Sequence, residues 1–123
     1  RIGGKADPKF LEKVWAFKVL DVFGRTGRPL EVEVQVITLG RDLAWVSLPG
    51  EVFAELGLAI KAGSPFKHTI LAELANGSIG YIPTSRGYDE GNYEPISARC
   101  AKGSGEILVE TALRLLREAH GDL

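Results

Sequence analysis

The spacing of apolar residues changes period along this chain of 123 residues. Residues 30–36, Leu-Glu-Val-Glu-Val-Gln-Val, alternate strictly between apolar and polar side chains, which is typical of a strand with one buried face. Residues 51–62 and 105–120 instead repeat apolar side chains at intervals of three and four, which predicts helices with one buried face. A chain of this length that mixes both periods must pack helices against a sheet in one core.

The predicted elements follow one another without an internal repeat. Asp7-Pro8 is typical of a helix start, and the helix that follows is expected to carry one broad apolar face from Phe10 to Val19. Asn76-Gly77 favours a tight hairpin turn between the third and fourth strands. We expect an α/β fold, a mixed sheet flanked by helices in the order α-β-β-α-β-β-loop-α. The ranges are 7–23 (helix), 30–36 and 43–48 (strands), 51–62 (helix), 68–74 and 78–82 (strands), 83–103 (loop) and 105–120 (helix).

Composition excludes several classes of protein and partner. Fifteen Lys and Arg against 16 Asp and Glu leave a net charge of −1, so nothing indicates binding to nucleic acid or to an anionic membrane. No apolar run is long enough for a transmembrane segment, and a single cysteine, Cys100, excludes an internal disulfide. The chain has no Met and begins at Arg1, so we expect a piece of a longer protein, either one domain or part of one.

Three residues are candidates for chemistry, and each has a structural alternative. Glu51 follows Pro49-Gly50 where a strand gives way to a helix, which is where α/β folds place their sites. It is either a metal ligand or general base, or a first-turn carboxylate that offsets the helix dipole. Tyr81 is either functional or a core aromatic residue, and Tyr93, in the long loop, is either functional or a surface tyrosine.

The histidines and the cysteine favour structural roles. His68 and His120 are too few to complete a histidine-based metal site, so a hydrogen-bonded role is expected for His68 and a helix-terminal charge for His120. Cys100 has neither a neighbouring histidine nor a second cysteine at a motif spacing, which favours an inert, half-buried thiol.

Three motifs, in order, resemble the neutral, non-lysosomal ceramidase family of zinc amidases. They are residues 48–53 (Leu-Pro-Gly-Glu-Val-Phe), residues 80–84 (Gly-Tyr-Ile-Pro-Thr) and Tyr93-Glu94. The resemblance extends over most of the chain from Leu30 to His120, and implies the C-terminal part of the catalytic domain. Pro83 and the surroundings of Tyr93 depart from the family pattern, which implies a divergent, bacterial-type member.

This resemblance implies a zinc site whose two histidine ligands lie upstream of the chain. Glu51 and Tyr81 would then be two of four zinc ligands, and Tyr93 would help to hold the substrate amide or its transition state. The metal would acidify a water that attacks the amide of a ceramide-like N-acyl lipid or a similar amide. The chain alone is expected to be inactive without its N-terminal part, and the family implies a secreted or periplasmic protein. The alternative is a non-catalytic module that keeps the fold and binds a partner or lipid through the 83–103 loop.

Overall fold

The computed structural model describes residues 9–25 and 27–123, with the Leu11 side chain excepted, and it divides into two compact units. In the first unit, residues 1–30, the described helix is α1 (Phe10–Gly24). The prediction of one broad apolar face is wrong, because at 100° per residue Phe17 and Val19 point to nearly opposite sides of the helix. The predicted start at Asp7-Pro8 lies outside the described residues.

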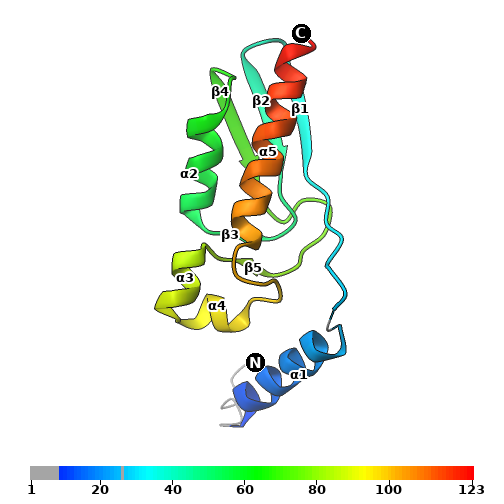
Figure 1. Ribbon diagram of the computed structural model, residues 1–123, viewed down its shortest axis with the longest axis vertical. Helices are drawn as coiled ribbons and strands as arrows, with labels where there is room; N and C mark the ends of the chain where they lie inside the picture. The colour runs from blue at the N-terminus through cyan, green and yellow to red at the C-terminus, as the bar shows by residue number, and fades with distance from the viewer. Residues whose placement is uncertain (1–8, 26) are drawn as a thin grey trace, which may run out of the picture. The chain divides into compact units, whose positions relative to one another are not determined.

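The second unit, residues 31–123, is built on a mixed sheet of three strands (Figure 1). Strands β1 (Gln35–Leu39) and β2 (Leu43–Ser47) pair antiparallel. Strand β4 (His68–Ala72) lies on the other side of β2 and runs parallel to it. The turn between β1 and β2 contains Gly40 at a φ of +61°, a conformation that glycine adopts at little cost.

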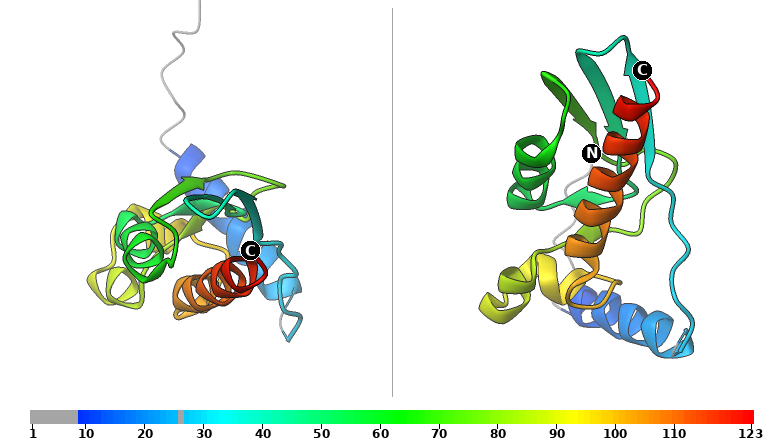
Figure 2. Two further views of the ribbon diagram at one scale, coloured as in Figure 1. Left: turned by 90° about the horizontal axis from the view of Figure 1, so that it is seen from above. Right: turned by 45° about the horizontal axis from the view of Figure 1, so that its top comes forward.

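Helices α2 (Ala54–Gly63) and α5 (Ser104–Gly121) pack on one face of this sheet (Figure 2). Alternate β2 residues, Ala44 and Val46, are fully buried beneath them. The predicted α/β class, with a mixed sheet flanked by helices, is therefore confirmed, with α2 and α5 on a single face of the sheet. The core comprises Ala44, Val46, Leu48, Val52, Leu56, Ile60, Phe66, Ile82, Leu108, Ala112 and Leu116.

The other face of the sheet, called here the outer face, is apolar and exposed. Ile37, Trp45 and Ile70 are register partners across the three strands and form one row on this face. They are exposed by 60%, 40% and 40% of their surface, and Leu39 beside them by 69%. An exposed apolar row of this kind favours association.

The predicted hairpin between the third and fourth strands is wrong. After β4 the chain continues beside residues 48–50: Leu74 N donates to Gly50 O at 3.3 Å and Ile79 N donates to Pro49 O at 2.8 Å. Strand β5 (Tyr81–Ile82) thus pairs in parallel with strand β3 (Glu51–Val52) in a second, two-stranded sheet. Asn76 and Gly77 do take positive φ angles, but the turn they make redirects the chain along β3 instead of back along β4.

Other boundaries differ from the prediction for local reasons. The first strand begins at Gln35 rather than Leu30, because its partner Ser47 is the last residue of β2. The predicted 83–103 loop contains two short helices, α3 (Ser85–Glu90) and α4 (Tyr93–Ser97). Thr84 caps α3 by accepting a hydrogen bond from Gly87 N at 2.9 Å.

In the described residues, no helix combines the length and apolarity that crossing a membrane requires.

Candidate functional site

Glu51 and Tyr81 lie opposite one another in the β3–β5 pair. The ladder is closed by Glu51 N donating to Gly80 O at 3.0 Å and by Phe53 N donating to Ile82 O at 3.1 Å. Their neighbours Val52 and Ile82 are buried in the core, so the alternation of a strand turns Glu51 and Tyr81 to the opposite side. The strand pairing thus brings these two residues together.

A glycine permits the close approach of the two strands. A Cβ atom on Gly50 would lie 2.5 Å from Gly80 O and 2.9 Å from Ile82 Cδ1, closer than van der Waals contact allows. Because Gly50 has no side chain, the chain at Pro49-Gly50 approaches β5 closely, and this places Glu51 opposite Tyr81.

The alternative interpretation of Glu51 as a helix-dipole residue is wrong. Helix α2 begins at Ala54, with Phe53 at its N-cap, and the acidic residue in its first turn is Glu55. Glu51 is instead an exposed strand residue beside a phenol.

Negative charge surrounds the Tyr81 phenol. The Glu51 carboxylate is the largest cause that raises the pKa of Tyr81 above its ordinary value, followed by burial and then by Tyr93. A hydrogen bond to Glu51 and the charge of Glu94 raise this pKa further. In the absence of a cation, Tyr81 therefore keeps its proton at neutral pH and shares it with Glu51.

Tyr93 stands beside Tyr81 at the first position of α4. The ring centroids are 5.9 Å apart with an interplanar angle of 77°, an edge-to-face contact. The Tyr93 side chain is about half exposed. Tyr93 therefore lies against Tyr81, and it begins a short helix instead of lying in the predicted loop. Glu94 had no predicted role, but its charge raises the pKa of Tyr81. Its position next to Tyr93 in the sequence could have indicated that it lies near the site.

Helix α5 fixes the segment that follows β5. Glu106 Oε1 accepts a hydrogen bond from Ser85 N at 2.7 Å, at the start of α3. That hydrogen bond is the main cause that lowers the pKa of Glu106 below its ordinary value, so the carboxylate is ionised at neutral pH. The chain carrying Tyr81 is therefore tied to the core helix just beyond Pro83 and Thr84.

The two histidines lie apart from these residues in the fold. His68 belongs to β4, where its main-chain N donates to Asp42 O at 2.8 Å, and its side chain is exposed. His120 lies in the last turn of α5, as predicted, with its ring edge-to-face against Phe66 at 4.9 Å.

The donor set of Glu51 and Tyr81 fits half of a zinc site. Zinc accepts carboxylate oxygen and needs four ligands, or three and a water, in a tetrahedral arrangement. Over residues 9–25 and 27–123, no group of three or more His, Cys, Asp and Glu residues could hold a metal ion. A zinc ion held here would need ligands other than those that the structure describes.

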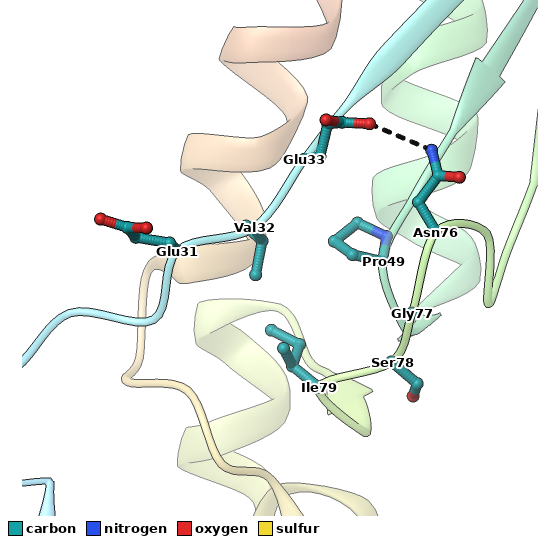
Figure 3. A pocket seen from close by; sticks show the side chains of 8 residues that line it. All are labelled: Glu31, Val32, Glu33, Pro49, Asn76, Gly77, Ser78 and Ile79. Atoms are coloured by element: carbon teal, nitrogen blue, oxygen red, sulfur yellow. Dashed lines mark hydrogen bonds between the residues drawn. The ribbon is translucent and has the colours of Figure 1, made fainter.

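A separate pocket of about 490 Å³ lies where residues 31–33 pass the 76–79 turn (Figure 3). Glu33 accepts a hydrogen bond from Asn76 at 3.2 Å, while Val32 and Ile79 supply apolar surface. None of the three predicted site residues lines it, and no sequence pattern predicted it. The full lining is Glu31, Val32, Glu33, Pro49, Asn76, Gly77, Ser78 and Ile79.

Two solved structures share the fold of this chain. Neutral ceramidase from Pseudomonas aeruginosa superposes with a TM-score of 0.69 and 18% sequence identity, over 98% of this chain and 21% of that chain. The chain shares its fold with part of a ceramidase. A ceramidase complexed with C2 superposes with a TM-score of 0.55 and 23% identity, over 70% of this chain and 15% of that chain.

The ceramidase likeness is one of fold and covers a small part of each ceramidase. The chain spans about one fifth of the first structure and less of the second. Neither a protein-family model nor a curated protein matches the sequence. The structures nevertheless support the resemblance inferred from the three sequence motifs, as that of a divergent, ceramidase-like region.

Proposed function

We propose that this chain supplies half of the zinc site of a hydrolase that cleaves the amide bond of ceramide-like N-acyl lipids. The observation that carries this proposal is the pairing of Glu51 with Tyr81, with the Tyr93 ring at 5.9 Å from the Tyr81 ring. The fold shared with part of two ceramidases supports it.

Glu51 and Tyr81 are the residues that would hold the metal. Zinc in such a site lowers the pKa of a bound water to about 7 and so supplies a nucleophile at neutral pH. The same positive charge would overcome the effect of Glu51 on Tyr81 and favour the phenolate, a better ligand than the phenol.

Tyr93 is suited to contact the substrate rather than the metal. Its side chain is about half exposed, and its ring is fixed against Tyr81. From that position its hydroxyl would donate a hydrogen bond to the amide oxygen, whose negative charge grows during attack. The remaining ligands, and the surface that binds the acyl chain, would come from the rest of a longer protein, which would also cover the outer face. By the same resemblance, we expect that protein to be secreted or periplasmic.

The test is hydrolysis of a fluorescent N-acylsphingosine by the full polypeptide encoded by the reading frame that contains these residues. We expect zinc-dependent release of the fatty acid, and a loss of zinc and activity in Glu51→Gln and Tyr81→Phe. Tyr93→Phe should keep zinc and lose about 100-fold in kcat, as for removal of one oxyanion donor. Glu55→Gln, an acidic residue nearby on α2, is the matched control and should match wild type.

Two results would contradict the proposal. One is a reading frame without further histidines, in a protein that binds lipid but does not cleave it, which would favour the non-catalytic module. The other is full activity in Glu51→Gln and Tyr81→Phe, which would leave both residues with structural roles.

A further inference from the structure

The main-chain carbonyl of Tyr81 has a partner outside the β3–β5 ladder. The carbonyls that accept hydrogen bonds from the β3 side belong to Gly80 and Ile82. In a strand, the carbonyl of the residue between them points the other way. That carbonyl accepts a hydrogen bond from Cys100 Sγ at 3.7 Å. Cys100 therefore contacts the backbone of Tyr81 from the side away from β3.

Tyr88 of α3 holds Cys100 in turn. Its hydroxyl donates to Cys100 O at 2.5 Å and lies 3.6 Å from Cys100 Sγ. Burial is the largest cause that raises the pKa of Tyr88, followed by its hydrogen bond with Cys100, so this hydroxyl remains a donor across the neutral range. Because α3 is itself capped by Thr84 and tied to Glu106, Tyr88 is fixed at its base.

We infer that Tyr88, acting through Cys100, is a positioning residue for Tyr81. Strand β5 has only two residues. So short a ladder does little to fix the orientation of the Tyr81 main chain, and with it the direction of the Tyr81 side chain. The chain of contacts from Tyr88 to Cys100 to the Tyr81 carbonyl supplies the missing constraint. It keeps the Tyr81 ring against Tyr93 and its hydroxyl beside Glu51. If the proposed function holds, this constraint also sets zinc affinity.

The first test follows the Tyr81 and Tyr93 rings by NMR in the metal-free chain. The protein has three tyrosines, so a tyrosine-labelled Tyr88→Phe variant reports on Tyr81 and Tyr93 alone. We expect the nuclear Overhauser effect between the two rings to fall by at least about half in Tyr88→Phe and Cys100→Ala, because this effect weakens steeply as the ring protons move apart from their edge-to-face contact. Cys100→Ser keeps a donor and should preserve it.

Thr111→Ala is the matched control, because it removes a side-chain hydrogen bond to a main-chain carbonyl on α5, far along the chain from Tyr81. It should leave the Tyr81–Tyr93 contact intact, with little change in stability because Ala is a good helix former. Unchanged tyrosine spectra in both Cys100→Ala and Tyr88→Phe would overturn the inference, because a merely structural role lowers stability without moving Tyr81.

A second measurement avoids dependence on variants that fail to fold. Methyl methanethiosulfonate converts the Cys100 thiol of the folded wild-type chain to a methyl disulfide, which removes the donor. The same weakening of the Tyr81–Tyr93 contact is expected, and an unaltered contact would again count against the inference.

Zinc affinity separates this inference from the proposed function. We expect zinc binding to weaken about tenfold in Cys100→Ala, the lower end of what groups that orient metal ligands contribute, and to be retained in Cys100→Ser. Equal loss in both variants would make the thiol a ligand and overturn the positioning role. These affinities are measured in the full polypeptide that supplies the remaining ligands. If that wild-type polypeptide binds no zinc at all, the proposed function fails, while the NMR result on the chain still decides the role of Tyr88 and Cys100.

Discussion

Glu51 lies directly opposite Tyr81 in a two-residue parallel ladder, although 30 residues separate them along the chain. So short a ladder gives little stability of its own. The pairing therefore depends on what surrounds it: the absent side chain of Gly50, the buried neighbours Val52 and Ile82, and the anchoring of α3 by Glu106.

Removing the charge of Glu51 should lower the pKa of Tyr81 towards its ordinary value. Glu51 is the largest cause of the raised pKa, so Glu51→Gln should ionise the phenol at a lower pH than wild type. Titration of the labelled tyrosine ring by NMR measures this directly, with Tyr81→Phe to assign the signal. Glu55→Gln is the control and should leave the titration unchanged. An equal pKa of Tyr81 in wild type and Glu51→Gln would show that the two side chains are not in contact.

Gly50→Ala should destabilise the protein by about 1–3 kcal/mol, because the added methyl group overlaps Gly80 O and Ile82. Urea unfolding gives the free energy. Gly121→Ala is the control, since a Cβ atom there has open space, and it should be neutral or slightly stabilising. Equal stability of the two variants would mean that β3 and β5 do not approach as closely as described.

The protein should lose stability in alkali through Tyr88. Its pKa is raised on folding, so the fold favours the protonated phenol, whereas the unfolded chain ionises near pH 10. The stabilisation is complete below pH 10 and is lost as pH rises beyond it.

Tyr88→Phe should therefore show a shallower alkaline decline in the free energy of unfolding. At neutral pH it should cost about 1–2 kcal/mol, because the Cys100 carbonyl loses its donor. Thr111→Ala, which removes no ionisable group, should keep the wild-type decline. Parallel declines for Tyr88→Phe and wild type would exclude Tyr88 as their source.

The outer face should make the isolated chain associate. Replacing Ile37 and Leu39 together by Thr keeps strand-compatible side chains and removes much of the exposed apolar surface. Sedimentation velocity should show this variant monomeric at concentrations where wild type associates. Leu58→Gln removes an apolar residue of similar exposure from α2 and should associate like wild type. If the Ile37 and Leu39 variant associates like wild type, the contact between copies of the chain lies outside the outer face.

Residue patterns predicted most elements because each follows from local periodicity, as in the helix that contains Leu108 and Leu116. The partner of β5 could not be predicted in this way. An Asn-Gly dipeptide is compatible both with a hairpin and with a turn that leads to a different strand. Here the second outcome is determined by the main-chain hydrogen bonds of Leu74 and Ile79 to residues 49–50.

The candidate site was predictable only through the order of its motifs. Nothing in the spacing of Glu51, Tyr81 and Tyr93 reveals that they meet, since the pairing is created by the parallel path of residues 74–82 beside residues 48–53. The Tyr88–Cys100 contact was not predicted either, because a single cysteine forms no recognisable sequence motif.

The most direct test of the central claim is calorimetric titration of zinc into the 123-residue chain and into its Glu51→Gln and Tyr81→Phe variants. Two oxygen ligands leave a zinc ion mostly hydrated, so wild type should bind it weakly, and each variant should bind it more weakly still. Release of the Tyr81 proton, visible as tyrosinate absorbance, is expected only in the full polypeptide, where further ligands would hold the zinc ion firmly. Tight one-to-one binding that persists in both variants would contradict the account, because the metal would then be held by residues other than Glu51 and Tyr81.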